Sequence, residues 1–526
     1  MKNKEHESSA AERKQMKRIV NSMEMKWLDS NTIDHFGIPS LVLMERAALS
    51  VVASMPPQLS QHSTVLVVCG NGNNGADGMA AARLLAQRGC SVIVAQMPDH
   101  GRRSKENQIQ LHILEQYGIP VFDDIPNGRY ACVLDALFGV GLSRAPQGVY
   151  ADWIDRMNCL EGYKVAVDLP SGVSSDTGQV YDAAFRADLT ITFAYAKIGQ
   201  LLYPGRAACG QVKVADIGIT DESWLKRRPS CFAPEKRDLC TIPQRPARSN
   251  KGTFGKVLVI AGSADMAGAA LFSAKAAYQA GCGLVKICTP AENRAVLLGA
   301  LPEAILSCYG AGGPDEKKLL SEIACADVVL LGPGIGMDDT AFRITETVLR
   351  SADQPLVIDA DGLNQIAAHP DFLQYAKPSW ILTPHPGEMA RLTAKTIPQV
   401  LESLLETACA FAGQYKVTCV LKDAATVTAA ADGTAYLNTS GCSAMAKGGS
   451  GDILSGIIAS FLAQGMEPKQ AAYMGVYVHG LAGEESAKKT GAYGLLARDL
   501  TAAAGRILDQ AAQKARKDAI KTEQEI

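Results

Sequence analysis

Residues 64–96 read TVLVVCGNGNNGADGMAAARLLAQRGCSVIVAQ and set the pattern for the first half of the chain. The β-branched run at 64–69 predicts a buried strand, the alanine-rich stretch at 79–87 predicts a helix, and 91–96 predicts the next strand. A strand, a crossover helix and another strand form the repeating unit of a parallel sheet covered by helices. Further strands are predicted at 132–134, 164–167 and 189–193. The first half is therefore expected to be an α/β sandwich.

The second half of the chain follows the same pattern. Strands predicted at 256–260 and 284–288 flank an alanine-rich helix predicted at 269–280. Further strand-like segments are VVLLGPGIG, PLVIDADGLN, WILTPHPGE and VTCVLKDAATVTAA. A second α/β sandwich is therefore expected here.

Between these halves, from 218 to 255, the periodicity gives way to prolines and charged residues. Such a change in composition marks a seam between domains. We therefore expect an N-terminal α/β domain at 1–222, a linker region at 223–249 and a C-terminal α/β domain at 250–526.

Composition and charge narrow the classes of partner. The 52 Lys and Arg residues nearly balance 54 Asp and Glu, so no overall field recruits nucleic acid or a membrane surface, and small-molecule partners are expected. The 14 cysteines contain no C-x-x-C pair, and several lie in apolar strand-like runs, where reduced core thiols are expected. The N-terminus is too polar for a signal peptide. These features favour a cytoplasmic protein.

The loop after the first strand, GNGNNGADG at 70–78, matches G-x-G-x-x-G, which alone is a weak signal for dinucleotide binding. A NAD dehydrogenase needs an acid at the end of the second strand to hold the ribose, but Ala95 and Gln96 stand there. An ordinary redox role is therefore disfavoured. Asn73, Asn74 and Asp77 are more polar than a purely structural turn requires, which favours ligand binding.

Two more strand ends carry side chains with oxygen atoms. Asp135 opens DALFGVGLSRA, and Asp168 opens DLPSGVSSDTG, which also contains Ser171. The carboxyl ends of parallel strands gather ligands at one edge of the sheet. Amide, carboxylate and hydroxyl oxygens at one point suit a hard monovalent or divalent cation. The alternative is that both aspartates only cap the turns that follow them.

GNGNNGADG, DALFGVGLSR and DLPSGVSSDTG, in this order, resemble the NAD(P)H-hydrate epimerase family over about residues 20–219. The resemblance implies a Rossmann-like three-layer fold, with potassium bound at Asn74, Asp135 and Ser171. It also implies that Asp168 contacts the substrate, and we expect this carboxylate to be the catalytic base. The further substrate contacts that it implies are Asn73, Asn74, Gly75, Ala76, Asp77, Gly139, Val140, Gly141, Leu142, Ser143, Arg144 and Ala145. The family usually has glycine where this chain has Ala76.

Residues 446–462, AKGGSGDILSGIIASFL, place a glycine-rich turn and one acid at the start of an apolar helix. Glycines let several N–H groups face one point, and the helix N-terminus carries about half a positive charge, so an anion site is predicted. A carboxylate would repel the anion unless Asp452 handles a proton on a neighbouring hydroxyl. This pairing favours phosphoryl transfer to an alcohol. The alternative is a glycine-rich turn that binds nothing.

Together with NKGTFGKVLVIAGS, LGPGIG, DADGLN, TPHPGE and KDAATV, this stretch resembles the ADP-dependent NAD(P)H-hydrate dehydratase family over about residues 250–508. The resemblance implies a ribokinase-like α/β fold that uses ADP, which Mg²⁺ is expected to accompany. It implies substrate contacts at Gly336, His385 and Asp452, with Asp452 as catalytic base. The nucleotide contacts that it implies are Lys422, Asp423, Ala424, Ala425, Thr426, Gly448, Gly449, Ser450 and Gly451. The family commonly has glycine where this chain has Asp423, which adds a negative charge beside the phosphate site.

We therefore predict a bifunctional nicotinamide-nucleotide repair enzyme, an isomerase fused to a lyase, that assembles as a homo-oligomer. Its first domain would interconvert the R and S epimers of NAD(P)H-hydrate (NADHX and NADPHX), and its second would dehydrate the S epimer with ADP, releasing AMP and phosphate. One alternative is a ribokinase-like small-molecule kinase with an accessory N-terminal domain. Another is a non-catalytic dinucleotide-binding module that senses redox state.

Overall fold

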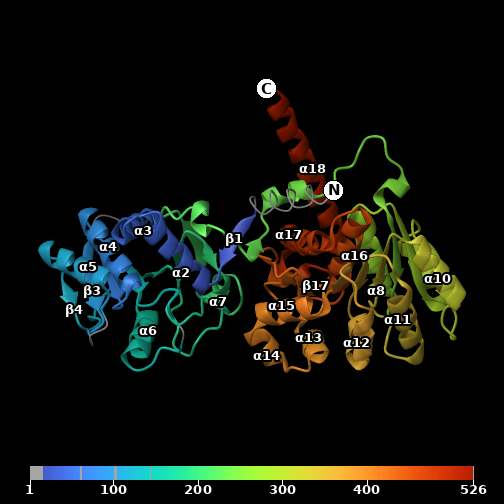
Figure 1. Cartoon of the computed structure of the whole chain (residues 1–526), viewed down its shortest axis with the longest axis horizontal. Helices are drawn as coiled ribbons and strands as arrows, with labels where there is room; N and C mark the ends of the chain where they lie inside the picture. Colours follow the sequence, from blue (N-terminus) through green and yellow to red (C-terminus); the bar gives the residue numbers. More distant parts are fainter. Residues whose placement is uncertain (1–15, 58, 60–61, 100–102, 143, 525–526) are drawn as a thin grey trace. The chain divides into compact units, whose positions relative to one another are not determined.

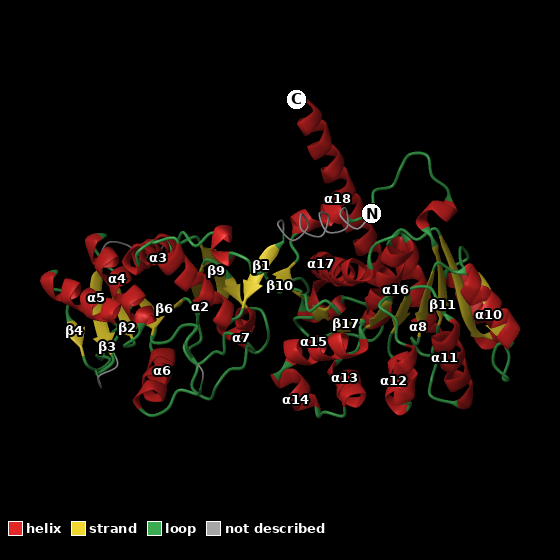
Figure 2. Cartoon of the chain, viewed as in Figure 1, coloured by secondary structure: helices red, strands yellow, loops and turns green. Residues whose placement is uncertain are grey.

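The computed structural model describes residues 16–57, 59, 62–99, 103–142 and 144–524. The chain forms two compact units, of which the first is Arg18–Ser230 and the second comprises the residues from Cys231 onward together with Met16 and Lys17 (Figure 1). The segment at 223–249, expected to be a linker, therefore contributes residues to both units. Each unit is an α/β fold, as predicted (Figure 2).

The first unit is built on a seven-stranded sheet in which every neighbouring pair of strands is parallel. In spatial order the strands are β4 (Val121–Phe122), β3 (Ser91–Gln96), β2 (Thr64–Cys69), β5 (Cys132–Ala136), β6 (Tyr163–Val167), β7 (Leu189–Phe193) and β9 (Gln211–Ala215). A short strand pair, β1 (Lys17–Val20) and β8 (Ala196–Lys197), lies apart from these seven. The strands predicted at 64–69, 91–96 and 189–193 are confirmed at those residues.

Helices cover both faces of this sheet. Because side chains alternate along a strand, Val65 and Val67 point to one face and Leu66 and Val68 to the other. The first pair packs with residues of α2 (Ser22–Ser30), α3 (Ser40–Ser54), α4 (Asn73–Gln87) and α5 (Lys105–Gln116). The second pair packs with Trp153 and its neighbours in α6 (Val149–Cys159). The unit therefore has three layers, with its core above and below the sheet.

Helix α4 begins at Asn73, well before the start predicted at 79. The glycines that suggested a loop allow this early start: a Cβ on Gly75 would collide with the carbonyl oxygen of Gly70. A helix can therefore begin directly against the loop that follows β2 only if this position lacks a side chain. As a consequence, Asn74 and Asp77 lie in the first turns of a helix and not in a loop.

The second unit has a sheet that is parallel from β13 to β17 and antiparallel at β18. Its spatial order is β13 (Ile305–Tyr309), β12 (Leu284–Pro290), β11 (Lys256–Ile260), β14 (Val328–Leu331), β15 (Leu356–Ile358), β16 (Trp380–Leu382), β17 (Thr418–Leu421), β18 (Val427–Ala429), β19 (Ala435–Leu437) and β10 (Cys231–Ala233). Strand β10, which pairs parallel with β19, lies inside the segment expected to be a linker.

One face of this sheet packs against α8 (Ala267–Gln279), α16 (Ser450–Ala463), α17 (Pro468–Gly494) and the start of α18 (Ala497–Gln524). Val257 and Leu330 belong to this core, while Val329 and Ile358, which alternate to the opposite face, are also fully buried. Most of α16 is buried, which explains why its sequence is apolar on all sides.

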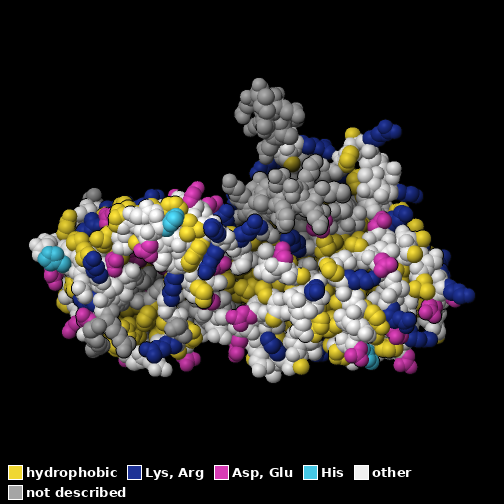
Figure 3. Space-filling view, viewed as in Figure 1, with side chains coloured by type: hydrophobic (Ala, Val, Ile, Leu, Met, Phe, Trp, Pro, Cys, Tyr) yellow, Lys and Arg dark blue, Asp and Glu magenta, His cyan; other side chains and the backbone are white. Residues whose placement is uncertain are grey.

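Charged side chains of both signs lie on the surface of the part of the chain that the structure describes. Basic and acidic side chains are interspersed over the visible face (Figure 3), in keeping with a formal net charge of −2. Among the described helices, none combines the length and the apolar character needed to cross a bilayer.

Candidate active sites

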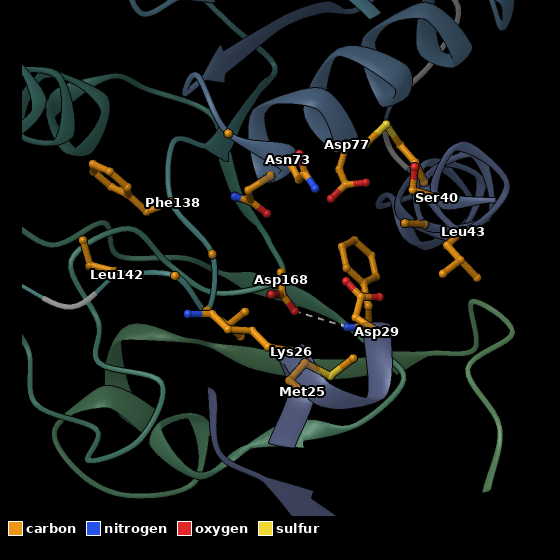
Figure 4. A pocket seen from close by; sticks show the side chains of 18 of the residues that line it. Met25, Lys26, Asp29, Ser40, Leu43, Asn73, Asp77, Phe138, Leu142 and Asp168 are labelled. Carbon is orange, nitrogen blue, oxygen red and sulfur yellow. Dashed lines mark hydrogen bonds between the residues drawn. The ribbon is translucent and has the colours of Figure 1, made fainter. Parts of the chain in front are cut away.

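The first unit contains a cavity of about 530 Å³ at the carboxyl ends of β2, β5 and β6, closed from the other side by α2 and α3 (Figure 4). Asn73, Asn74 and Asp77 reach it from the start of α4, and Asp168 reaches it from the end of β6. The cavity therefore lies where ligands collect in a parallel α/β sheet. The structure brings together three of the loops that the sequence predicted to form a site.

Asp168 is held in one orientation by a network of buried groups. Its Oδ1 accepts hydrogen bonds from Lys197 Nζ at 2.6 Å and from Thr192 Oγ1 at 3.0 Å. The backbone has a φ of +66°, a left-handed conformation that is unusual for a residue with a side chain, and Gln200 Nε2 donates to its carbonyl oxygen at 2.6 Å. Its other carboxylate oxygen, Oδ2, faces Gly139, where a Cβ would stand 3.3 Å away. One oxygen is thus engaged by protein, while the other faces the cavity.

Two other carboxyl groups border the same cavity, Asp29 from α2 and Asp77 from α4 (Figure 4). Burial, reinforced by the charges of Asp168 and Asp29, raises the pKa of Asp77 well above its usual range. Burial and the charge of Asp168 also raise the pKa of Asp29, against an opposing effect of Lys197. Both side chains remain open to the cavity although protein surrounds them. Carboxyl groups with raised pKa values on one cavity suit an acid–base reaction.

The potassium ligands that the resemblance implied lie beneath this cavity. Asp135 is fully buried, and its carboxylate accepts hydrogen bonds from the amide and the hydroxyl of Ser171, both at 2.7 Å. Burial raises the pKa of Asp135 to about 6, although these hydrogen bonds oppose the shift. Asn74 has a buried side-chain Nδ2 without a hydrogen-bond partner, and its Oδ1 would lie 3.2 Å from a Cβ on Gly139. The side-chain oxygens of Asn74, Asp135 and Ser171 are of the ligand type that a hard cation prefers.

The remaining predicted residues of the first site differ in position. Gly139, Val140, Gly141 and Leu142 line the cavity. Gly75 and Ala76 are buried in α4, and neither they nor Arg144 and Ala145 are among the described residues that border the cavity. Ser143 lies outside the described residues.

In the second unit, α16 begins with Gly449 as its N-cap at a φ of +91°, and Asp452 lies in its first turn. A Cβ on Gly451 would stand 3.5 Å from Lys422 Nζ and 3.8 Å from Asp359 Oδ2, so the helix start closely approaches this ion pair. Burial raises the pKa of Asp452 to about 7; the charges of Asp359 and Asp361 add to this shift, and Lys422 opposes it. A carboxyl group with such a pKa can take up a proton near neutral pH.

Lys422, the first residue of the predicted nucleotide segment, follows β17 and pairs with Asp359 at 2.8 Å. Burial favours its neutral form, but the charges of Asp359 and Glu388 outweigh this effect and raise the pKa of Lys422. Burial also raises the pKa of Glu388 to about 7, against the opposing charge of Lys422. The ammonium group therefore remains a cation beside the anion-attracting end of α16, where a phosphate group can meet both.

His385, a predicted substrate contact, is the N-cap of α13 (Pro386–Thr393). Its Nδ1 accepts from the backbone amides of Gly387 at 3.0 Å and Glu388 at 3.3 Å, and its Nε2 lies 3.3 Å from Glu388 Oε1. Burial, with Lys422 and Arg391, lowers the pKa of His385. An imidazole that accepts at Nδ1 is in the tautomer that carries its proton on Nε2. The ring is half-exposed and so remains within reach of a ligand.

The other predicted residues of the second site lie in two turns and at the start of α16. Gly336 has a φ of +85°, and its amide donates to Asp361 Oδ2 at 2.9 Å, with open space where a side chain would stand. Asp423 and Ala424 are exposed, whereas Ala425 and Thr426 are buried. The residues that form the turn into α16 are Gly448, Gly449, Ser450 and Gly451. The Ser450 hydroxyl donates to the carbonyl oxygen of Met445 at 2.7 Å.

Sequence reasoning did not identify three charged residues at these sites, Lys197, Asp29 and Glu388. Lys197 lies in the apolar segment FAYAKIGQ, where a single lysine stands out, and this isolation is the one signal that could have marked it. Asp29 lies in a polar helix among other charges and carries no such signal. Glu388 was present in the quoted segment TPHPGE but was given no role.

Two family matches cover most of the chain. Residues 257–506 match the family described as NAD(P)H-hydrate dehydratase, and residues 40–199 match the family described as YjeF-related protein N-terminus. The first match covers the second unit with Lys422 and Asp452, and the second covers Asn74 to Lys197 in the first unit. Apart from Asp29, the rest of α2 and Gln200, the residues described above at the two candidate sites fall within the two matched regions.

Full-length relatives combine the same two regions. The bifunctional NAD(P)H-hydrate repair enzyme of Thermofilum pendens is 35% identical over 91% of this chain and 94% of its own length, and that of Escherichia coli K12 is 35% identical over 90% and 91%. A ribokinase-like superfamily protein from Enterococcus faecalis V583 is 33% identical, has a TM-score of 0.50, and covers 54% of this chain and 98% of its own. The ribokinase-like fold of the second unit is thereby confirmed. The chain belongs to the family of bifunctional NAD(P)H-hydrate repair enzymes.

Proposed function

We propose that each unit of this chain carries one step in the repair of hydrated nicotinamide dinucleotides. The first unit interconverts the R and S epimers of NADH-hydrate and NADPH-hydrate, and the second dehydrates the S epimer with ADP, releasing AMP and phosphate. The observation that carries the proposal is Asp452, a carboxyl group with a pKa raised by burial to about 7 at the anion-attracting start of α16. In a member of this family, that combination suits removal of a proton from a hydroxyl as it is phosphorylated.

In the second unit, Asp452 takes the proton of the substrate hydroxyl while that oxygen attacks the β-phosphorus of ADP, and AMP leaves. Backbone amides at the start of α16 and the Lys422 ammonium stabilise the charge on the transferring group. The ring nitrogen's lone pair then expels phosphate, which is a far better leaving group than hydroxide. Loss of a proton from the neighbouring ring carbon restores the dihydronicotinamide.

The nucleotide would contact the turn from Lys422 to Thr426, where Asp423 is exposed beside the proposed phosphate position. Mg²⁺ in such sites is typically held by phosphate oxygens, water and one or two carboxylates, and it neutralises charge on the phosphates. Asp359 and Asp361, which face Lys422 and Gly336, are the carboxylates placed to serve it.

In the first unit, the free Oδ2 of Asp168 faces the cavity at the end of β6. Inversion at the hydroxyl-bearing carbon requires either departure and return of the hydroxyl or opening of the ring, with proton transfers in both routes. Asp168 would receive and return that proton. Asp77, which shares the cavity and has a raised pKa, is placed to donate one.

Potassium would be held by Asn74, Asp135 and Ser171. The fully buried Asp135 carboxylate and the side-chain oxygens of Asn74 and Ser171 fit an oxygen-ligated cation. The ion would supply positive charge beside the substrate. Proton transfer itself is assigned to Asp168 and Asp77, not to the ion. The free core thiols, such as Cys69 and Cys132, fit the reducing cytoplasm in which we place this activity.

The test is to incubate the purified full-length chain with mixed epimers of NADH-hydrate, ADP and Mg²⁺. We expect full recovery of the near-ultraviolet absorbance of NADH and release of free phosphate equal to the NADH formed. A kinase of the ribokinase type would instead leave a stable phosphorylated product without free phosphate, and that outcome would refute the proposal.

A further inference from the structure

Lys197 is a fully buried cation whose hydrogen bonds all lie around one carboxylate. Its Nζ donates to Asp168 Oδ1 at 2.6 Å, to Thr192 Oγ1 at 2.8 Å and to the carbonyl oxygen of Phe193 at 3.1 Å. An ammonium group has three hydrogens, and these three acceptors use them all. A neutral amine has only two, so this arrangement requires the charged form of the lysine.

Thr192 closes a ring of hydrogen bonds between the same groups. It accepts from Lys197 and donates to Asp168 Oδ1 at 3.0 Å, while the Phe193 amide approaches the same oxygen at 3.4 Å. All these donors converge on Oδ1, whereas Oδ2 faces Gly139 and the cavity. The carboxylate therefore has one anchored oxygen and one that substrate can reach.

Hydrogen bonds also hold the backbone of Asp168 in an unusual conformation. Its φ of +66° is uncommon for an aspartate and carries a conformational cost. The Asp168 amide donates to Ile191 O at 2.8 Å, and Gln200 Nε2 donates to Asp168 O at 2.6 Å. Gln200 also accepts from the Lys197 amide at 2.8 Å, so the segment that carries Lys197 holds both the backbone and the side chain of Asp168.

Asp168 shares the cavity with other charged groups, and its contacts with protein distinguish it from them. Asp29 and Lys26 face the cavity from α2, and Asp77 faces it from α4 (Figure 4). Of the three carboxyl groups, Asp168 is the one that forms an ion pair with Lys197, at 2.6 Å. We propose that Lys197 is a positioning residue for epimerisation: it anchors Oδ1 of Asp168, so that this carboxylate and not Asp29 or Asp77 presents an oxygen in a fixed position to the substrate.

This inference rests on the proposed epimerase function, and it assigns Lys197 no contact with substrate. Proton transfer needs the base to lie within hydrogen-bond reach of the reacting group, so loss of the anchor should lower the rate of reaction more than substrate affinity.

The test compares Lys197→Met with Lys164→Met in the full-length chain. Lys164 lies in β6 and its Nζ donates to the carbonyl oxygen of Leu160 at 3.0 Å, so it serves as a lysine control in the same unit. Pure R epimer is supplied with ADP and Mg²⁺. As long as dehydration by the unchanged second unit is faster than epimerisation, the rate of NADH formation reports the rate of epimerisation. Dehydration of pure S epimer by each variant is measured separately to verify this condition.

For Lys197→Met we expect kcat of epimerisation to fall about 10²–10⁴-fold with little change in KM. Lys164→Met should match the parent in both respects. A Lys197→Met variant that keeps the parent's kcat, or that loses activity through KM alone, overturns the inference.

If Lys197→Met unfolds the first unit, Thr192→Val provides the second test, because it keeps the lysine and removes one donor to Oδ1. Its kcat should fall about tenfold, the effect of one hydrogen bond, with KM unchanged. An unchanged kcat would overturn the inference. If the parent itself does not convert R epimer, the proposed epimerase function is wrong. If the parent and the Lys197→Met variant convert R epimer equally fast, only the role of Lys197 is refuted.

Discussion

In each unit we propose an aspartate as the base, and the surroundings of these two aspartates differ. Asp168 is joined directly to a fully buried ammonium, with Lys197 Nζ 2.6 Å from its Oδ1. In the second unit, Lys422 is joined instead to Asp359 at 2.8 Å, and Asp452 stands beside that pair. Burial raises the pKa of Asp452 to about 7; the charge of Asp359 adds to this shift, and the charge of Lys422 opposes it.

The difference matches the two kinds of chemistry. A base that meets a phosphate group must not bring a permanent negative charge close to it, because like charges repel. Asp452 avoids a permanent negative charge, because a carboxyl group with a pKa of about 7 is readily protonated near neutral pH. The reaction that we propose for the first unit involves no phosphoryl transfer, and there the proposed base lies beside a cation. One residue type thus serves two roles because its surroundings differ.

The largest effect should come from Asp452→Asn, which keeps the shape of the side chain and removes its ability to accept a proton. We expect dehydration of the S epimer to slow about 10²–10⁴-fold, the usual loss for a general base. Phosphate release measures this directly. Conversion of R to S epimer, followed by chromatography in the same sample, should continue at the parent's rate. Near-normal dehydration by the variant would show that Asp452 is not the base.

A smaller effect is expected from pH. Because the pKa of Asp452 is raised to about 7, its ionised fraction falls as pH drops through that value, and dehydration should slow about tenfold for each unit below it. Asp361 contributes to the raised pKa, so Asp361→Asn should shift the acid limb to lower pH. A rate that does not change between pH 5 and pH 8, about two units below and one above that pKa, would contradict this assignment.

The smallest effect concerns the proposed ion site. Asp135→Asn retains the size of a buried side chain that accepts hydrogen bonds from Ser171, but it removes the charge next to the ion. Epimerisation should weaken at low potassium and recover partly at high potassium, because a weaker site fills when more ligand is present. Dehydration of S epimer is the control and should be unaffected. Epimerisation that is equally slow at every potassium concentration would argue against an ion at Asp135.

Much of the fold could be predicted because strands in parallel sheets are continuous apolar runs. The strands at 64–69 and 91–96 were identified to the residue for that reason. The start of α4 and strand β10 were not predicted, since both depend on tertiary contacts. Glycines that favour a loop in isolation allow α4 to begin close to Gly70, and β10 gains its partner only when β19 is folded.

The sites could be predicted only where chain order brings their residues into recognisable motifs. Asp168 and Asp452 lie in such motifs; in the structure Asp168 borders the cavity of the first unit, and Asp452 lies in the first turn of α16. Lys197 lies 29 residues after Asp168, and the two meet only through the positions of β6, β7 and β8. Periodicity and spacing in the sequence carry no information about such a pair, because the contact exists only in the folded chain.

The central claim, that each unit performs one step, is tested most directly by Asp168→Ala with an equal mixture of the two epimers. The chain is supplied with excess ADP and Mg²⁺, and NADH recovery is followed over a time short compared with spontaneous epimerisation. The variant should convert the S epimer at the parent's rate and then stop near half recovery, while the parent continues to completion. If Asp168→Ala recovers the second half as fast as the parent, Asp168 is not the epimerase base and the division of labour fails.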